Sequence, residues 1–104
     1  MTIFYIQYKA IPSDVSKAFK TSGGAYISCW VKATSIEVAK AMAERAINQN
    51  QWIILNLEEA FFINDEHYEE DEESLEFYQQ AIIDGEVYVY DTWPNEKQDG
   101  EQVH

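Results

Sequence analysis

The chain has 104 residues, which suits one domain, and 46% of them are hydrophobic, which is ample for a folded core. Its formal net charge is −12, but residues 1–57 hold six of the seven basic residues, whereas residues 58–104 hold sixteen of the nineteen acidic ones. This distribution argues against nucleic acid as a partner, because phosphates are bound by clustered Lys and Arg, and it favours cationic partners for the second half.

The chain begins with two predicted strands. Residues 2–9 carry apolar side chains at both parities, which indicates a strand with two usable faces. Residues 21–24 contain two glycines and are expected to form a turn. Residues 25–33 then alternate regularly, with Ile27 and Cys29 on the apolar parity, so we predict a second strand here.

A helix and a third strand are predicted next. Thr34 and Glu37 fit a capping box, in which the Thr34 hydroxyl accepts a hydrogen bond from the Glu37 amide and starts a helix over residues 34–50. Residues 52–63 are typical of a strand, but their apolar parity changes along the segment. We therefore predict a bulge or a turn near residues 58–59, and the segment forms either one strand or two.

The last predicted elements are a helix, a strand and a tail. Carboxylates favour the positive end of a helix, so a second helix is expected to begin at Glu72, Glu73 or Ser74 and to end at Gly85. Residues 86–93 alternate as a final strand. Residues 94–104 are acidic and have little to bury, so we expect a disordered tail after a single domain of residues 1–93.

These elements predict an α+β fold. Its expected form is a two-layer sandwich, in which two helices cover one face of a four- or five-stranded, mostly antiparallel sheet. If residues 51–63 hold two strands, residues 24–93 have the β-α-β-β-α-β order of a ferredoxin-like fold.

An aromatic sheet face follows from this two-layer arrangement. If Ile27 and Val87 face the helices, the opposite face carries Tyr26, Trp30, Tyr88 and Tyr90. These side chains could cover one another as cross-strand pairs within the monomer, or they could form a homodimer interface, since large apolar patches usually mark interfaces. A small-molecule pocket is a further alternative, whereas stacking of nucleic-acid bases is disfavoured because basic residues are missing.

A long acidic stretch lies between Glu58 and Glu76 and contains no Lys or Arg. A solvated surface is the simplest interpretation, and docking of a basic protein is the alternative. The residues predicted for such docking are Asp65, Glu66, Glu69, Glu70, Asp71, Glu72 and Glu73. Metal binding is a third interpretation, although the spacing of a calcium loop is absent. Its candidate ligands are Asp65, Glu66, His67, Glu69 and Asp71.

No catalytic, metal or cofactor motif is present in the sequence. The single cysteine, Cys29, shares the parity of Ile27 and is expected to be a buried, inert thiol, while His67 and His104 are expected to be ordinary exposed histidines. We expect a reducing, cytoplasmic location because one cysteine cannot form an internal disulfide. We expect no membrane association, because no apolar run approaches about 20 residues.

A set of short motifs is spread over about residues 24–93. They are Gly24-Ala25-Tyr26 leading to Cys29-Trp30, a helix ending before Trp52, Tyr68 with Phe77-Tyr78, and Asp84-Gly85-Glu86-Val87. This set resembles a family of small uncharacterised bacterial proteins. The resemblance implies no known activity, so no functional residue is transferred from it.

The sequence therefore predicts a small acidic protein with an interaction role. We expect a non-catalytic module that dimerises through the aromatic face, with the acidic half available to a basic protein. The alternative is a ligand-binding or enzymatic domain with a pocket between the aromatic face and the acidic loop, formed by Trp30, Tyr88 and Tyr90 with Glu66 or His67.

Overall fold

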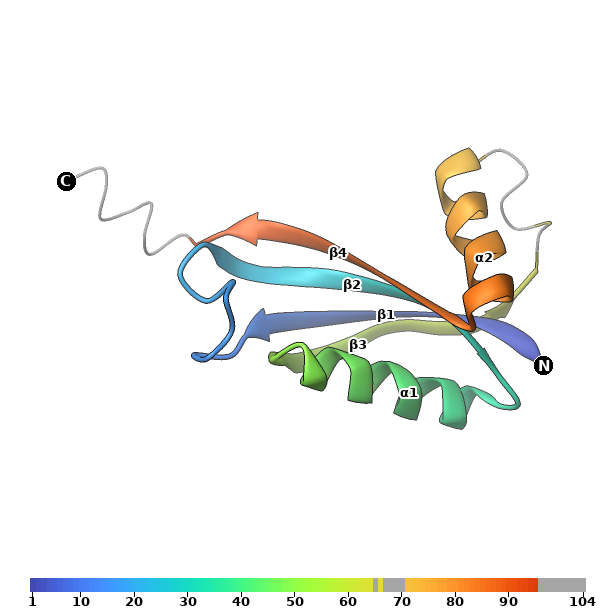
Figure 1. Cartoon of the computed structure of the whole chain (residues 1–104), viewed down its shortest axis with the longest axis horizontal. Coiled ribbons are helices and arrows are strands. Elements are labelled where there is room, and N and C mark those ends of the chain that lie inside the picture. Colours follow the sequence, from blue (N-terminus) through green and yellow to red (C-terminus); the bar gives the residue numbers. More distant parts are fainter. Residues whose placement is uncertain (65, 67–70, 96–104) are drawn as a thin grey trace.

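The computed structural model describes residues 1–64, 66 and 71–95, which form one sheet and two helices (Figure 1). In chain order the elements are β1 (Thr2–Pro12), β2 (Ser22–Ala33), α1 (Ile36–Gln49), β3 (Trp52–Ile63), α2 (Glu72–Asp84) and β4 (Glu86–Pro94). The predicted α+β fold with an antiparallel sheet is confirmed, and it is ferredoxin-like only in combining one such sheet with two helices. The predicted tail beyond Asn95 lies outside the described residues.

The strands lie in the order β3-β1-β2-β4, and each is antiparallel to its neighbours. Since β2 and β3 are both antiparallel to β1, they are parallel to each other, and α1 makes the crossover that this connection needs. Residues 52–63 form one strand, so the β-α-β-β-α-β order that depended on two strands is not formed.

The predicted irregularity in β3 is present. The β1–β3 register shifts between Gln7, which lies opposite Glu59, and Tyr8, which lies opposite Leu57, so Glu58 is an extra residue on β3. A second shift between Lys9 and Ala10 makes Leu55 an extra residue in the same way. The prediction of a bulge near residues 58–59 is therefore confirmed.

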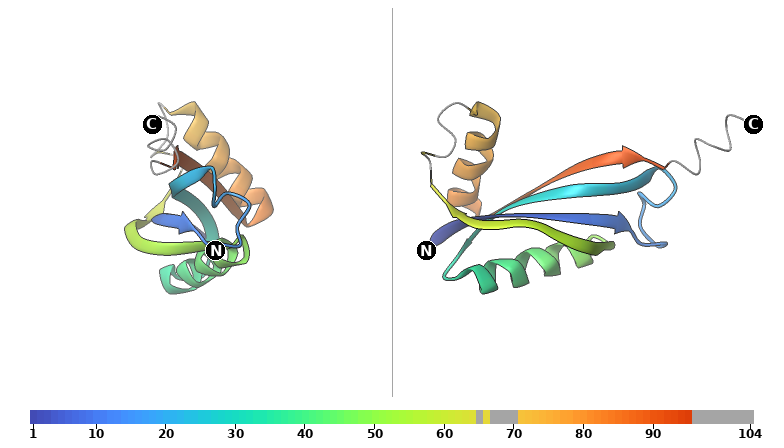
Figure 2. Two further views of the ribbon diagram at one scale, coloured as in Figure 1. Left: turned by 90° about the vertical axis from the view of Figure 1, so that its left-hand side faces the viewer. Right: turned by 180° about the vertical axis from the view of Figure 1, so that it is seen from behind.

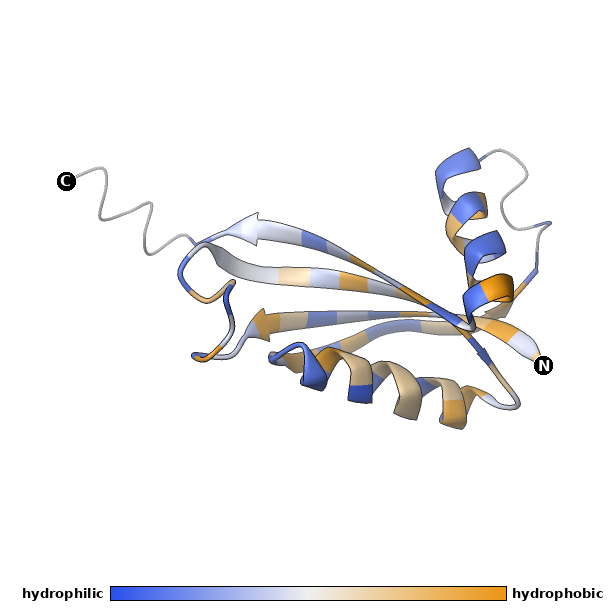
Figure 3. Cartoon of the chain, viewed as in Figure 1, coloured by the Kyte–Doolittle hydropathy of each residue, from blue (hydrophilic) through white to orange (hydrophobic). Residues whose placement is uncertain are grey.

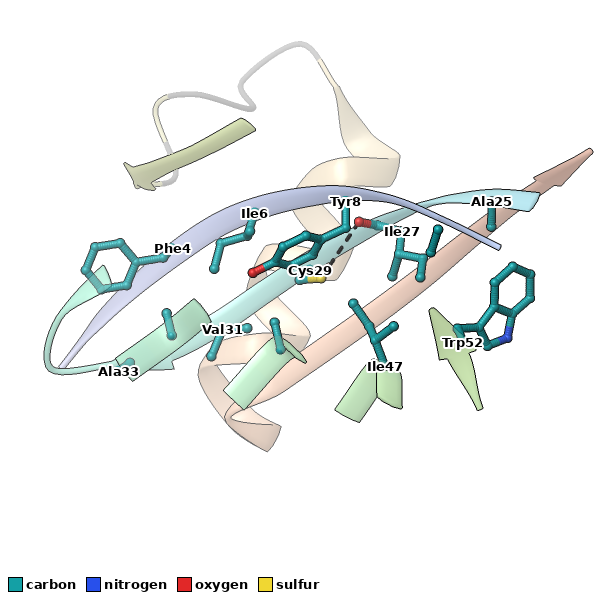
Figure 4. Packing of buried hydrophobic residues seen from close by; sticks show 13 residues of the cluster. Phe4, Ile6, Tyr8, Ala25, Ile27, Cys29, Val31, Ala33, Ile47 and Trp52 are labelled. Carbon is teal, nitrogen blue, oxygen red and sulfur yellow. Dashed lines mark hydrogen bonds between the residues drawn. The ribbon is translucent and has the colours of Figure 1, made fainter. Parts of the chain in front are cut away.

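The main core lies between α1 and one face of the sheet (Figure 4). Ala39 and Ala43 are fully buried, and their small side chains allow α1 to lie close to the strands. Tyr8 and Cys29 lie at the centre of this core, and the Tyr8 hydroxyl donates a hydrogen bond of 3.0 Å to the Glu44 carboxylate. The buried residues of the cluster are Phe4, Ile6, Tyr8, Ala10, Ala25, Ile27, Cys29, Val31, Ala33, Ala39, Ala43, Ile47 and Trp52.

The second helix, α2, lies on the opposite face of the sheet, across one end of the strands (Figures 1 and 2). This differs from the expectation that both helices cover one face. The reason is topological: Ile63 pairs with Ile3 and Glu86 pairs with Val31, so β3 ends and β4 begins at the same end of the sheet but on opposite edges. The connection crosses the sheet at that end, where α1 already occupies the first face.

The face of α2 that packs on the sheet is small. Ala81 is its one fully buried residue, and Ile83 in its last turn is 76% exposed. Figure 3 shows hydrophilic residues along most of α2 and its most hydrophobic part in that last turn. Within the described part of the chain, no helix has the length and apolar character needed to cross a membrane.

Candidate interaction surface

The four predicted aromatic residues do not share a face. In the β2–β4 register, Cys29 lies opposite Tyr88 and Ile27 lies opposite Tyr90, so both tyrosines lie on the α1 side. Tyr26 and Trp30 belong to the other parity and lie on the α2 side. The prediction that these four residues share one face is therefore wrong. The cause is the last strand, in which both parities carry large apolar side chains, so its pattern could not indicate which one faces α1.

Tyr88 and Tyr90 are half-buried parts of the main core. The Tyr90 ring contacts Trp52 at a centroid distance of 5.5 Å, and its hydroxyl accepts a hydrogen bond of 3.1 Å from the Asn50 amide. Burial raises the pKa of Tyr90, and the hydrogen bond from Asn50 partly offsets this rise. Burial also raises the pKa of Tyr88, with Glu86 adding to the effect.

The sheet side opposite α1 extends well beyond α2, and we call this part the outer face. It is formed by Tyr5, Gln7, Lys9, Ile11, Tyr26, Ser28, Ile53, Asn56, Glu59, Phe61, Asp91 and Trp93. The strand register arranges these side chains in rows across the sheet, with apolar rows at both ends and polar rows between them.

The row nearest α2 is aromatic. Tyr5 lies between Trp30 and Phe61, with ring centroids 5.2 and 5.4 Å away, and Trp30 continues to Phe77 of α2 at 5.1 Å. Trp30 is buried beneath α2, whereas Phe61 is 41% exposed. The row therefore runs from the helix-covered interior to an exposed end on the edge strand.

The middle of the outer face is polar and hydrogen-bonded. The Tyr5 hydroxyl and the Ser28 hydroxyl lie 3.1 Å apart, and the Gln7 amide donates to both, at 3.3 and 3.4 Å. Burial raises the pKa of Tyr5, and its bond with Ser28 opposes this rise. Glu59 lies opposite Gln7 in the register. This part of the face thus presents neutral polar groups beside a carboxylate.

The far row is built around Trp93. Its ring lies 5.3 Å from that of Tyr26, and the Lys9 ammonium lies 6.0 Å from the Trp93 ring centre, within reach of a cation–π interaction. The ring occupies the space above Gly24, where a Cβ would overlap it. Gly23 and Gly24 belong to β2 and do not form the predicted turn.

The sequence pattern does not identify Phe61 and Trp93 as members of the outer face. Two glycines at the start of a strand indicate that another group approaches the backbone closely, and this signal could have identified a large partner such as Trp93. No comparable signal existed for Phe61, because its face depends on the bulges in β3.

The acidic residues are described only in part. Glu66, Glu72 and Glu73 are exposed, whereas Asp65, His67, Glu69 and Glu70 lie outside the described residues. Asp71 is the N-cap of α2 and accepts a hydrogen bond of 3.2 Å from the Ser74 amide. Hydrogen bonding by the Ser74 side chain, followed by that of the Ser74 amide, lowers the pKa of the Asp71 carboxyl. Within residues 1–64, 66 and 71–95, no cluster of potential ligands could hold a metal ion.

Two surface cavities lie away from the outer face. One of about 520 Å³ includes Lys17, Asn50, Trp52 and Tyr90 in its lining, and one of about 340 Å³ lies between α2 and the start of β1. Tyr90 lines the first of these cavities, and neither of the two is lined by Trp30, Tyr88 or Glu66. The pocket of the alternative interpretation therefore stays a prediction. Cys29 is fully buried, and burial raises the pKa of its thiol to about 12.

Comparisons with protein-family models, with curated proteins and with solved structures found no match. The resemblance to small bacterial proteins therefore stays a prediction.

Proposed function

We propose that the protein is a non-catalytic interaction module that forms a homodimer through the outer face. The observation that carries this proposal is the exposure of large apolar side chains on a sheet side that α2 covers at one end only. Tyr26, Phe61 and Ile53 are 36%, 41% and 48% exposed. Aromatic and aliphatic side chains grouped in this way are typical of interface cores.

The shape of this side favours a second copy turned end for end. Because α2 projects from one end of the sheet, a second copy in the same orientation would place its own α2 against the α2 of the first copy, and the two helices would collide. The reversed copy brings the row of Phe61 and Tyr5 against the row of Ile53 and Trp93. Two aligned sheets pack about 10 Å apart in such an arrangement, and a two-fold axis closes the dimer.

The polar rows suit the same arrangement. Lys9 is the basic residue of the outer face, and Glu59 and Asp91 are its acidic residues. In the reversed pair, Lys9 of each copy faces the neighbourhood of Glu59 in the other, so opposite charges meet twice. Four strands spaced about 4.8 Å apart give a small interface, and we expect a dissociation constant in the micromolar range.

A binding role also agrees with the chemistry of the described residues. The Cys29 thiol, with its pKa raised to about 12, is protonated at neutral pH and is a poor nucleophile. The same buried, reduced thiol fits a cytoplasmic setting, which we retain as part of the proposal.

Sedimentation equilibrium at about 10 to 100 µM tests the proposal, because this range spans the expected dissociation constant. The average mass should rise across this range from near that of the 12.1 kDa chain toward twice that value. Tyr26→Arg places a second cation beside Lys9 and should return the monomer. Val38→Arg changes a residue of α1 that is 45% exposed, and it should leave the dimer intact.

A monomeric mass throughout this range would contradict the proposal. Equal loss of the dimer in Tyr26→Arg and Val38→Arg would also contradict it, because only the former changes the outer face. Circular dichroism of both variants confirms that each is folded.

A further inference from the structure

The outer edge of β3 is a second surface, distinct from the outer face. β3 pairs with β1 alone, so no described strand lies along its other side. Edge strands of stable proteins are usually short, charged or covered, because their unpaired backbone groups can pair with another strand. β3 is twelve residues long and exposes several large apolar side chains. These are Ile53, Leu55, Leu57, Phe61 and Phe62, between 41% and 54% exposed.

The centre of this edge is negatively charged. Glu58 and Glu59 are exposed, and β3 contains no Lys or Arg. The Asn56 amide donates a hydrogen bond to the Glu58 carboxylate, which holds that carboxylate beside the strand. A strand that docks here therefore meets apolar side chains toward both ends and carboxylates in the middle.

This charge pattern disfavours a second copy of β3 as the occupant. The midpoint of Trp52–Ile63 lies between Leu57 and Glu58. In a symmetric antiparallel pair centred there, Glu58 and Glu59 of both copies gather at the axis, and like charges on neighbouring strands are destabilising. A strand that carries Lys or Arg at its centre replaces this repulsion with attraction.

We propose that the outer edge of β3 accepts an extended strand from a basic protein, which adds a further strand to the sheet. Backbone hydrogen bonds along the edge supply affinity, and alternate side chains of the added strand supply specificity. On the α1 side the added strand meets Leu57 and Phe62, and on the other side it meets Ile53 and Glu59. The strong net negative charge of −12 accelerates the encounter with a basic partner.

This inference does not rest on the proposed homodimer. The dimer uses a face of the sheet, whereas the added strand uses its edge. Ile53, Glu59 and Phe61 lie where the two surfaces meet. The test is therefore based on Glu58, an extra residue of the bulge with no partner in the β1–β3 register, whose carboxylate bonds with Asn56 at the border of the outer face.

The probe is an acetylated peptide of about twelve residues, the length of β3, in which Val and Thr alternate with Lys. Fluorescence anisotropy of the labelled peptide measures its binding to the full chain. Two further versions carry N-methyl groups on one or the other alternate set of amides, which removes backbone donors without changing the side chains. An added strand points only one of these sets at the protein, so one version should bind about tenfold more weakly or worse and the other should bind unchanged.

Charge reversal gives the second arm of the test. Glu58→Lys should weaken binding of the Lys peptide by about tenfold and strengthen binding of a matched Glu peptide. Tyr26→Arg should leave both affinities unchanged, which separates the edge from the dimer face. Glu58 is exposed, and circular dichroism checks the fold of its variant.

Three results would overturn the proposal. The first is absence of binding up to about 1 mM of the Lys peptide, a concentration that corresponds to a binding free energy of about −4 kcal/mol. The second is equal weakening of peptide binding by both N-methyl sets. The third is a binding affinity that Glu58→Lys does not change. The first shows that the edge accepts no such strand. The second and third show that charge or apolar attraction without strand pairing explains the binding, or that it occurs elsewhere.

Discussion

The Trp93 ring lies against the backbone of Gly24, its partner in the β2–β4 register, in the space that a Cβ would occupy. This contact joins the last strand to the start of β2. Tyr26 packs against the same ring from two residues further along β2. One aromatic side chain thus fixes the far row of the outer face, and the absence of a side chain at Gly24 makes its position possible.

We expect Gly24→Ala to destabilise the protein by about 1 to 3 kcal/mol, because the added methyl group forces the Trp93 ring to move. Urea unfolding followed by tryptophan fluorescence measures this change. In a Trp93→Ala background the same substitution should cost much less, since the obstructing ring is gone. Additive free energies in this double-mutant cycle would contradict the proposed contact.

The first half of the fold could be predicted from the sequence because its patterns are one-sided. Residues 25–33 have small apolar side chains on one parity, so Ile27 and Cys29 had to face the main core, as they do. The change of parity near Glu58 correctly predicted a bulge, because a single extra residue moves all later side chains to the other face.

The outer face could not be predicted because it depends on contacts between distant elements. Val87 and Tyr88 are both suitable core residues, and only the pairing of Tyr88 with Cys29 decides which of them faces α1. The side occupied by α2 depends on the edges that it connects, which the chain order alone does not reveal. Local patterns predicted the elements, and non-local pairing determined the surface.

The start of α1 gives a prediction that separates two neighbouring residues. The expected cap was Thr34, but the structure places the N-cap at Ser35, whose hydroxyl accepts a hydrogen bond of 3.2 Å from the Val38 amide. We expect Ser35→Ala to lower the free energy of unfolding by about 1 kcal/mol. Thr34→Ala should change it by less than about 0.5 kcal/mol, as is usual for exposed residues outside caps. A larger loss of unfolding free energy in Thr34→Ala than in Ser35→Ala would instead favour the capping box of Thr34 and Glu37.

Stability should decrease in alkaline solution because of buried tyrosines. Burial, followed by the bond to Glu44, raises the pKa of Tyr8 above its ordinary value of 10.0. Because this pKa is raised in the folded state, the contribution of Tyr8 to stability is fully present below pH 10 and is lost as the unfolded chain ionises above it. Urea midpoints between about pH 8 and 11 should therefore fall at the alkaline end.

Tyr8→Phe isolates the contribution of Tyr8 to this decrease. The variant loses one hydrogen bond, so at pH 7 we expect it to be less stable by about 1 kcal/mol. Above pH 10 its stability should fall less steeply, by up to about 1.4 kcal/mol per pH unit, because one ionising group is removed. Parallel curves of stability against pH for the original protein and Tyr8→Phe would show that Tyr8 ionises equally in the folded and unfolded states.

The Cys29 thiol should be unreactive until the protein unfolds. It is fully buried in the main core, and burial raises its pKa to about 12, so a thiol reagent at pH 8 finds neither access nor thiolate. With an aromatic disulfide reagent, we expect labelling at the rate of global opening, and complete labelling within minutes in urea. Since labelling then reports unfolding, Gly24→Ala should accelerate it by about tenfold for each 1.4 kcal/mol of stability that it removes. Rapid labelling of the folded protein, unchanged by Gly24→Ala, would show instead that local opening exposes the thiol.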